Sequence, residues 1–507
     1  MREEVRRWWF IGSRNSNHQM RIIKLVLVFL VFAINATGQG YNHQWLLGNY
    51  YFLQDPKGRM FIDNNSIALQ TEFRKMPFLG SQANISDVNG NLLMASNGIW
   101  IANATGDTML NGGGLNPSPF TSNWMFGLPI SFSNIFLSFP NDSINYLLIH
   151  STLWSTLFPA LSGIYYTKVD LSLDGGLGGV SLKNDTIFSD SLSWGIGACR
   201  HANGRDWWII TQELESSRYL CFLLTSGGIY SPKSVVSGLI PSNRDYNCNA
   251  VFSKDGSIYA TCFARNFIQI FDFDRCSGQL SNSKRIYNEE MHVNGIGFIE
   301  LSADNHYLYL SSIYKIWQYD LTSSNIMASE KVIGLWDTMY YHNLFSTAFY
   351  TVCRAPDDQI YASCYSSNVY LHKISFPNRN GDSCDFRLRA LTLPEFSLDL
   401  PQSTNYNLGA LPGSGCDSLS QTMDHTIDQI HVYPNPAQEK LLFNNNTKKD
   451  IVRLKIYNVF GLEIANMDIL QKTNPMTIDI SNFENGTYFY SCTFKNCTSK
   501  CNSICNN

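Results

Sequence analysis

Residues 254–272 read Lys254-Asp-Gly-Ser-Ile-Tyr-Ala-Thr-Cys-Phe-Ala-Arg-Asn-Phe-Ile-Gln-Ile-Phe-Asp272. A turn of Asp and Gly comes first, and two runs of aromatic and β-branched residues follow it. Turn residues that bound such runs indicate a β-hairpin. The second run, residues 267–272, alternates in residue type as a half-buried strand does. The stretch is therefore typical of an antiparallel sheet.

The same combination of turn and strand recurs between residues 41 and 415. Successive turns lie roughly 50–60 residues apart, near the ~40–50 residues of a propeller blade. A single blade cannot bury both of its faces, so the repeats must stack around an axis. The five further turns are Asp87–Gly90, Pro140–Ser143, Asn203–Asp206, Ala303–Asn305 and Pro356–Asp358.

We therefore predict an all-β protein in which residues 39–415 form a β-propeller of about seven blades. Six repeats are clear from the turns. The stretch Trp45–Phe61 and residues 385–410 are expected to complete a seventh blade and close the ring. A tandem of β-sandwiches is the alternative architecture for the same repeats.

Composition argues against some classes of function. Hydrophobic residues make up 44% of the 507 residues, charged residues make up 15%, and the net charge is −4. Lys and Arg form no block beyond the extreme N-terminus, so nucleic-acid binding has little electrostatic support. The 13 cysteines favour an oxidising compartment, and their odd number leaves at least one outside any intramolecular pair.

Residues 1–38 have the pattern of a secretory signal peptide. A basic lead precedes the apolar run Leu25–Ala33, and small residues then suit cleavage before Gln39. The apolar run is too short to span a bilayer, and no other segment resembles a membrane span. Because the pattern begins directly after Met20, we expect translation to start there. A genuine but longer leader is the alternative.

Residues 428–507 carry short motifs in a fixed order. They are Val432-Tyr-Pro-Asn-Pro436, Lys440-Leu-Leu-Phe443, Leu454-Lys-Ile-Tyr-Asn-Val-Phe-Gly461, Ile478-Asp-Ile-Ser481 and Asn485-Gly-Thr-Tyr488. In order and spacing, this region resembles the type A C-terminal sorting domain of type IX secretion cargo. Alternating apolar residues favour a small Ig-like β-sandwich of about seven strands. The preceding residues 416–427 are polar and rich in turn residues, as a linker is.

This resemblance implies a route, partners and a destination. The chain would be exported to the periplasm, and the type IX translocon and its sortase-like protease would then handle the sorting domain. The product would be secreted or held at the outer-membrane surface. The residues expected to carry the sorting signal are Tyr433, Pro434, Asn435, Pro436, Gly461, Gly486 and Tyr488.

The last residues depart from the pattern of that family. Sorting domains of this type end in an apolar strand with a basic residue near the C-terminus. Here the residues after Phe494 are polar and include three cysteines. We therefore expect no strand after Phe494.

The propeller region resembles a family as well. Its landmarks are Trp45-x-x-Gly48, Asp87-x-Asn-Gly-Asn-Leu-Leu93, Gly175-Gly-Leu-Gly178, His201-x-x-Gly-x-Asp-Trp-Trp208, Asp272-Phe-Asp-Arg-Cys-x-Gly278, Leu408-Gly409 and Cys416-Asp417. They look like the uncharacterised WD40-like propeller proteins found ahead of type IX sorting domains. The resemblance implies a fold and brings no activity with it, because propellers host binding, scaffolding and catalysis alike.

The most unusual local cluster consists of His201, Asp206, Trp207 and Trp208. As candidate ligand-binding residues, His201, Asp206 and Trp207 would lie at a blade end near the central channel. Alternatively, Asp206 caps a turn, His201 is a satisfied turn histidine, and the two tryptophans pack on opposite faces of a strand. We favour this second, structural interpretation.

Two cysteine pairs suit disulfides by their positions. Cys248 and Cys262 flank the turn at Asp255 almost symmetrically. Cys384 and Cys416 bracket the final repeat, where a bond would help to hold the ring closed. The sequence alone does not decide the connectivity.

Metal and cofactor motifs are weak in this chain. No Cys or His pattern has the spacing of a zinc site. The stretch Asp170-x-Ser172-x-Asp174-Gly175 begins like a calcium loop, but Ser181 stands where the loop needs its bidentate Glu. We therefore expect no metal and no cofactor.

These observations lead to a functional hypothesis. The protein is expected to be secreted or cell-surface type IX cargo whose propeller binds a glycan or a protein. The alternative is a surface polysaccharide hydrolase or lyase with its site in the propeller channel, and a structural component of an envelope assembly is a third possibility. Because no nucleophile, metal set or cofactor motif is recognisable, a non-catalytic role is favoured.

Overall fold

The structure is a computed structural model, and the chain divides into two compact units, residues 1–418 and 419–507. The expected signal peptide and most of the expected linker lie outside the described residues. Those described are 40–48, 56–63, 66–155, 160–242, 248–402, 404–417, 430–433, 439–445, 451–458, 462–469, 475–483, 487–494 and 501–506.

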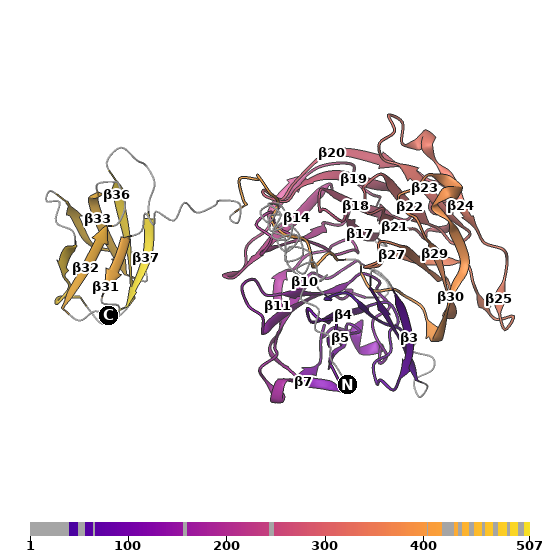
Figure 1. The fold of residues 1–507 in the computed structure, drawn as a ribbon, viewed down its shortest axis with the longest axis horizontal. Helices are drawn as coiled ribbons and strands as arrows, with labels where there is room; N and C mark the ends of the chain where they lie inside the picture. Colours follow the sequence, from indigo (N-terminus) through magenta and orange to yellow (C-terminus); the bar gives the residue numbers. More distant parts are fainter. Residues whose placement is uncertain are drawn as a thin grey trace, which may run out of the picture. The chain divides into compact units, whose positions relative to one another are not determined.

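The first unit consists of antiparallel sheets that fan around a common centre (Figure 1). The described residues of this unit form seven blades, which we call blades I to VII. Blades I and II form one eight-stranded sheet, but a single parallel pair, Gly179 with Leu110, joins them. The prediction of an all-β propeller of about seven blades is confirmed.

The strands of blades I to III follow in chain order. Blade I contains β4 (Ala83–Ser86), β5 (Leu92–Ser96), β6 (Trp100–Asn103) and β7 (Thr108–Gly113). Blade II contains β8 (Asn134–Ser138), β9 (Asn145–His150), β10 (Ile164–Asp170) and β11 (Gly179–Phe188). Blade III contains β12 (Gly197–Arg200), β13 (Trp207–Gln212), β14 (Arg218–Thr225), β15 (Gly228–Ile229) and β16 (Lys233–Val236).

Blades IV to VII complete the ring. Blade IV contains β17 (Cys248–Phe252), β18 (Ile258–Phe263), β19 (Phe267–Asp274) and β20 (Gln279–Ile286). Blade V contains β21 (Phe298–Leu301), β22 (Tyr307–Ser311), β23 (Lys315–Asp320) and β24 (Lys331–Leu335). Blade VI contains β27 (Phe349–Arg354), β28 (Ile360–Cys364), β29 (Asn368–Ile374) and β30 (Phe386–Ser397), and blade VII contains β1 (Gln44–Leu46), β2 (Lys57–Ile62) and β3 (Ile67–Glu72).

Short elements connect the blades. A small hairpin precedes blade VI, and one short α-helix precedes blade V. Asn288 caps this helix by accepting a hydrogen bond from the Met291 backbone N–H, and Gly295 ends it with a φ of 65°. The elements are β25 (Tyr340–Tyr341), β26 (Phe345–Ser346), α2 (Glu289–Asn294), η1 (Thr121–Asn123), η2 (Asp174–Gly176), η3 (Met327–Ser329) and η4 (Gly381–Cys384).

Each of the six turns read from the sequence joins the first two strands of a blade. Asp side chains, and Asn203 in blade III, hold these turns by accepting hydrogen bonds from backbone N–H groups two to four residues later in the chain. Asp87, for example, accepts from the N–H groups of Asn89 and Asn91 at 2.8 and 2.9 Å. The repeat seen in the sequence is therefore the repeat of the blades.

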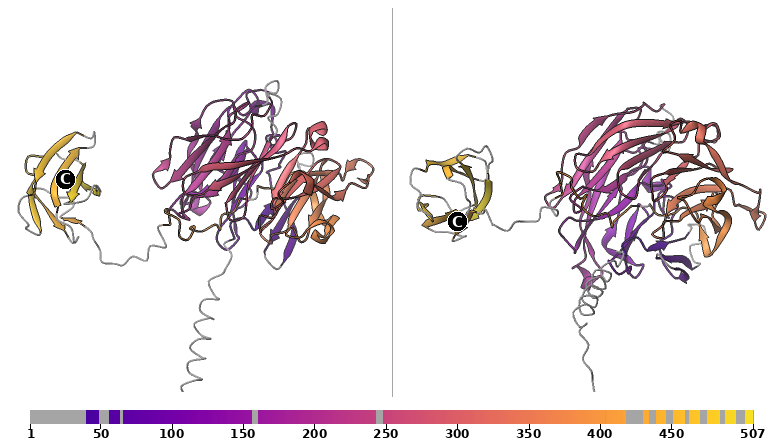
Figure 2. Two further views of the ribbon diagram at one scale, coloured as in Figure 1. Left: turned by 90° about the horizontal axis from the view of Figure 1, so that it is seen from above. Right: turned by 45° about the horizontal axis from the view of Figure 1, so that its top comes forward.

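Apolar side chains join neighbouring blades. The first strands of successive blades lie side by side, as β12 with β17 and β21 with β27 do (Figure 2). Trp207 is fully buried in a core that spans blades I to III, whereas Trp208 packs in the core between blades III and IV. Burying a large apolar side chain of this kind stabilises the fold by about 1.5–3 kcal/mol.

The predicted composition of the seventh blade is wrong in one respect. The structure places β30 in blade VI, where it pairs with β29 in the register Tyr370 with Thr392. Blade VII consists of β1 to β3 alone. A hairpin between strands close in sequence loses less chain entropy than pairing with a strand some 320 residues away, which favours the local partner.

The residues after blade VI run along the inside of the ring, and we call residues 398–417 the closing segment. The Tyr406 hydroxyl donates to the Phe136 carbonyl at 2.8 Å, and Gln402 Nε2 donates to the Ile196 carbonyl at 2.6 Å. Leu400 and Trp45 share an apolar core with blade VI. The closing segment thus contacts blades that are far apart in the sequence.

The second unit is a two-sheet sandwich. Its described strands form the sheets β31-β32-β35 and β34-β33-β36-β37, and apolar residues such as Leu454 and Tyr490 lie between them. The prediction of about seven strands is confirmed. The strands are β31 (Ile430–Tyr433), β32 (Lys440–Asn445), β33 (Ile451–Asn458), β34 (Glu463–Asp468), β35 (Met476–Asp479), β36 (Thr487–Phe494) and β37 (Cys501–Asn506).

The expectation of no strand after Phe494 is wrong. Strand β37 pairs antiparallel with β36, and Cys501 lies opposite Cys492. Backbone N–H and C=O groups make the ladder, so a polar sequence can occupy the edge of a sheet. Among the described residues, no helix has the length and apolar character that crossing a membrane requires.

One buried carboxyl group belongs to the closing segment. Asp399 is 3% exposed, and one of its oxygens accepts a hydrogen bond from the Ser131 hydroxyl at 3.3 Å. The other oxygen has no partner among the described residues. Burial raises the pKa of Asp399 to about 8, so the group is largely protonated at neutral pH.

We expect Asp399 to make the propeller less stable as pH rises. The folded state keeps this proton up to pH about 8, whereas the unfolded chain releases it near pH 4. Between these values the unfolded state binds fewer protons, so the contribution of Asp399 to stability falls with rising pH. We compare the free energy of unfolding of the wild type with that of Asp399→Asn. The difference, wild type minus variant, should fall by on the order of a few kcal/mol between pH about 4 and pH about 8. Urea denaturation at several pH values measures this difference, and a constant difference would contradict the assignment.

Candidate functional site

An open cleft of the propeller lies at the turns of blades I to III. Its volume is about 580 Å³, within the usual range for ligand sites. It lies beside the cluster that the sequence singled out, because Arg200, Gly204 and Arg205 flank His201 and Asp206. Its lining residues are Tyr41, Asp87, Val88, Ser138, Phe139, Pro140, Asn141, Asp142, Ser143, Tyr146, Arg200, Gly204 and Arg205.

Arg200, at the end of β12, is the central cation of this cleft. Its guanidinium lies 3.9 Å from the centroid of the Trp207 ring, which fixes the plane of the group. Its terminal nitrogens donate to the Arg205 carbonyl at 2.5 Å and the Ser138 hydroxyl at 3.1 Å. Burial lowers the pKa of Arg200 to about 10, so the group stays charged at neutral pH.

Arg200 forms no direct ion pair with a described residue, and the carboxylate of Asp206 acts on its charge only at longer range. No carboxylate of a described residue lies within 4.0 Å of it, and its Nε has no acceptor there. A guanidinium presents a planar fork that matches carboxylate, sulfate and phosphate groups. The arrangement suits contact with an anion.

Arg205 differs from Arg200 because it is already paired. It is exposed, and its Nε and Nη2 donate to the two carboxylate oxygens of Asp206 at 2.8 and 3.0 Å. Asn203 donates to the same carboxylate at 2.7 Å. Burial opposes ionisation of Asp206, but the hydrogen bonds from Arg205 and Asn203 hold its pKa below the usual range.

The other carboxylates of the cleft are engaged in turns. Asp142 accepts hydrogen bonds from the Ile144 and Asn145 backbone N–H groups and from the Asn145 side chain. Burial slightly opposes ionisation, yet these bonds lower the pKa of Asp142, and the equivalent bonds lower that of Asp87. Both groups therefore remain ionised in the neutral range, where a general acid would have to hold a proton.

The three predicted ligand-binding residues, His201, Asp206 and Trp207, do not line the cleft, and their polar groups form hydrogen bonds within the protein. His201 accepts from the Asn203 backbone N–H through Nδ1 at 3.1 Å, and its Nε2 donates to the Cys276 carbonyl at 3.0 Å. Trp207 is fully buried, and its indole N–H donates to the Ser138 carbonyl at 3.1 Å. This geometry favours the structural interpretation of His201, Asp206 and Trp207, and a direct role in binding stays a prediction.

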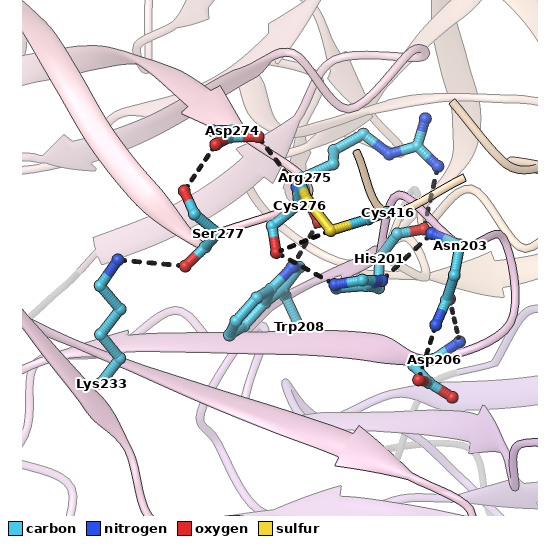
Figure 3. Close-up of a disulfide and its surroundings, with 10 residues drawn as sticks. All are labelled: His201, Asn203, Asp206, Trp208, Lys233, Asp274, Arg275, Cys276, Ser277 and Cys416. Carbon is cyan, nitrogen blue, oxygen red and sulfur yellow. Dashed lines mark hydrogen bonds between the residues drawn. A yellow bond between two sulfur atoms is a disulfide. The ribbon is translucent and has the colours of Figure 1, made fainter. Parts of the chain in front are cut away.

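A disulfide joins Cys276 to Cys416 next to His201 (Figure 3). Side-chain hydrogen bonds hold the turn that contains Cys276 in place. Asp274 accepts from the Cys276 backbone N–H and the Ser277 hydroxyl, and Trp208 donates to the Arg275 carbonyl at 2.8 Å. Cys416 stands at the start of the predicted linker, so this bond fixes the end of the closing segment to blade IV.

Both predicted disulfides are therefore corrected. Cys416 bonds to Cys276, and Cys384 is a buried thiol. Cys262 is also a buried thiol, and the register of blade IV pairs Cys248 with Phe263 and Cys262 with Asn249. Cys262 Sγ instead lies 3.4 Å from the Gly297 carbonyl oxygen.

The predicted sorting residues are only partly described. Tyr433 pairs with Leu442 in the register of β31 and β32, and Tyr488 is buried beside Phe483. Pro434, Asn435, Pro436, Gly461 and Gly486 lie outside the described residues. Among the described residues, no group of three His, Cys, Asp or Glu side chains has an arrangement that holds a metal ion.

A comparison with known protein families identifies the second unit. Residues 431–504 match the secretion system C-terminal sorting domain family, so the prediction for this region is confirmed. The tail marks the chain as type IX secretion cargo and implies export to the cell surface or the extracellular space. No curated protein matches the chain.

Several solved structures resemble the propeller. A putative 6-phosphogluconolactonase from Bacteroides uniformis is 14% identical with a TM-score of 0.44, covering 71% of this chain and 99% of that chain. The periplasmic gluconolactonase PpgL of Pseudomonas aeruginosa is 10% identical with a TM-score of 0.40, covering 71% and 98%. The β-propeller domain of Cps50 (Swd1) from Myceliophteria thermophila is 11% identical with a TM-score of 0.35, covering 64% and 93%.

Loss of the disulfide should weaken the propeller. We expect the double variant Cys276→Ser/Cys416→Ser to lower the free energy of unfolding by roughly 2–5 kcal/mol, because the bond closes a loop of 140 residues. Guanidinium denaturation measures this value. A reductant should destabilise the wild type more than it destabilises the double variant. Equal denaturation midpoints for the two oxidised proteins would contradict the expectation.

Proposed function

We propose that the protein is a surface-displayed or released type IX cargo whose propeller binds an anionic glycan in the cleft at blades I to III. The observation that carries the proposal is the guanidinium of Arg200, which has no ion-pair partner among the described residues and lies on the wall of a cleft of about 580 Å³. Sugars carrying carboxylate or sulfate groups offer the anion that this guanidinium recognises.

The remaining wall of the cleft fits a sugar ligand. Phe139 and Tyr41 are half-buried and offer ring surface, and Ser138 and Tyr146 add hydroxyl groups. Binding sites generally combine such apolar surface with a few polar groups. Burial raises the pKa of Tyr146 to about 12, so its phenol remains neutral and can donate a hydrogen bond.

A catalytic site in the channel has less support. The closing segment lies along the inside of the ring, and the cavity between it and the inner strands measures about 20 Å³. This space is far smaller than a sugar residue, for which sites of roughly 300 Å³ or more are usual. The binding interpretation therefore accounts better for the geometry than a hydrolase or lyase that acts within the channel.

The sorting unit should be required for export. In a host with a type IX system, we expect the full chain to reach the surface or the medium, starting near Gln39 and lacking the sorting domain. A variant without residues 419–507 should remain in the periplasm. Cell fractionation and mass spectrometry of both chain ends test this. Equal export of the two proteins would show that the tail is not the signal.

Arg200 should determine binding of acidic polymers. We expect the full chain to bind polygalacturonate or chondroitin sulfate, and Arg200→Gln to weaken that binding at least tenfold, or about 1.4 kcal/mol. Arg200→Lys keeps the charge but loses the planar fork, so it should retain part of the affinity. Biolayer interferometry measures the affinities. Repeating the measurement at a second salt concentration shows how much of each affinity is electrostatic, because salt screens charge interactions.

A matched control is available in Arg379. Its guanidinium also lies over an aromatic ring, 4.2 Å from the centroid of Phe376, but it is exposed and outside the cleft. Arg379→Gln should leave binding unchanged. If both variants bind equally well, or if neutral dextran binds as tightly as the acidic polymers, the proposed ligand class is wrong.

A further inference from the structure

Five amide oxygens without a hydrogen-bond donor belong to residues that line one cavity inside the ring. Each of these oxygens is buried, and none has a partner among the described residues. The cavity measures about 20 Å³ and lies between inner strands and the closing segment. The residues are Asn42, Gln44, Gln82, Asn134 and Gln402.

The orientation of most of these amides is fixed by their nitrogen atoms. Gln82 Nε2 donates to the Leu46 carbonyl at 2.6 Å, and Gln402 Nε2 donates to the Ile196 carbonyl at 2.6 Å. The amide nitrogens of Gln44 and Asn134 likewise donate to backbone carbonyls, at 3.0 and 3.3 Å. Exchanging oxygen and nitrogen would bring two acceptors together, so the oxygens keep their places.

The set of groups around the cavity is unusual in its chemistry. Five residues that each have an unpartnered amide oxygen line a space that holds about one water-sized species. A water molecule brings two protons, which satisfy two of the five acceptors. A cation needs no protons and is coordinated by several oxygens at once. An unsatisfied buried acceptor destabilises the fold, so the species that satisfies most of the five acceptors is favoured.

The charge of the cavity narrows the choice of cation. None of its lining residues is acidic or basic; besides the five amides they include Asn84 and Tyr406. A divalent ion would lose much hydration energy with no carboxylate to offset the loss. Neutral carbonyl oxygens coordinate monovalent ions, as the rings of carbonyl groups in potassium channels do.

We propose that this cavity binds a monovalent alkali cation, Na⁺ or K⁺, through the amide oxygens of Gln44, Gln82, Asn134 and Gln402, with Asn42 beside them. These ligands come from blade VII, blade I, the start of blade II and the closing segment, respectively. The ion therefore links the N-terminal and C-terminal parts of the ring. No ladder of backbone hydrogen bonds joins these parts among the described strands.

Two measurements on the full wild-type chain test the site directly. Crystals soaked in RbCl or thallium acetate should show an anomalous peak at the cavity. Thermal unfolding in NaCl or KCl, compared with choline chloride at equal ionic strength, should show a saturable rise in Tm of about 2 °C. Comparison of NaCl with KCl identifies the preferred ion. Density of water alone, together with equal Tm values in all three salts, would overturn the proposal.

A pair of variants separates the site from general stability. Gln82→Met removes a proposed ligand and should abolish the difference between the alkali salts and choline chloride. Gln212→Met is the matched control. Gln212 is also buried, its nitrogen donates to the Ser216 carbonyl, and its oxygen lacks a partner, but it lies outside the cavity. This control should keep the cation effect. Retention of the full effect in Gln82→Met would overturn the assignment of the ligands.

Discussion

Closure of the ring is the constraint on which the rest of the propeller depends. Each blade leaves apolar faces that only its two neighbours can cover, so the last blade must meet the first. Blade VII comes entirely from the N-terminal part of the chain and packs against blade VI through Trp45 and Tyr361, whose ring centroids lie 5.8 Å apart. The closing segment then runs inside the ring, and the bond of Cys416 to Cys276 fixes its end. Apolar packing, hydrogen bonds and one covalent bond thus replace the strand pairing that would otherwise join the chain's ends.

The architecture was readable from the sequence because local chemistry determines it. An Asp or Asn that caps its own turn and an alternating strand such as residues 267–272 need no distant partner to be recognised. Ring closure depends instead on contacts across some 130 to 320 residues, such as the hydrogen bond between Tyr406 and Phe136 and the ring contact between Trp45 and Tyr361, and no periodic pattern in the sequence indicates them. The placement of β30 was missed for a related reason. Its alternating residues suit either blade, and the cost of loop closure decides between them.

The candidate site was found only in part. The sequence indicated the turn at residues 201–206, but it directed attention to His201, Asp206 and Trp207, whose polar groups serve the turn and the neighbouring blades. Arg200 lies one residue before that cluster, and its role depends on the Trp207 ring beneath it and on turns from two other blades. The buried pair Trp207 and Trp208 indicates a rigid part of the fold. Arg200 lies against Trp207 and also lines the cleft, so it is the better candidate for binding. Its side chain is already held in place and loses little further entropy when a ligand binds.

The cysteines show why a disulfide cannot be assigned from position along the chain. Cys276 and Cys416 are 140 residues apart along the chain, yet the fold brings their sulfur atoms together in a disulfide. Cys199, Cys221 and Cys364 are buried in blades, and burial raises the pKa of each thiol to about 12. Thiolate is the reactive form, so burial makes these thiols less reactive toward oxidation. Among the described cysteines of the propeller, the packing of the blades therefore determines which pair lies close enough to bond.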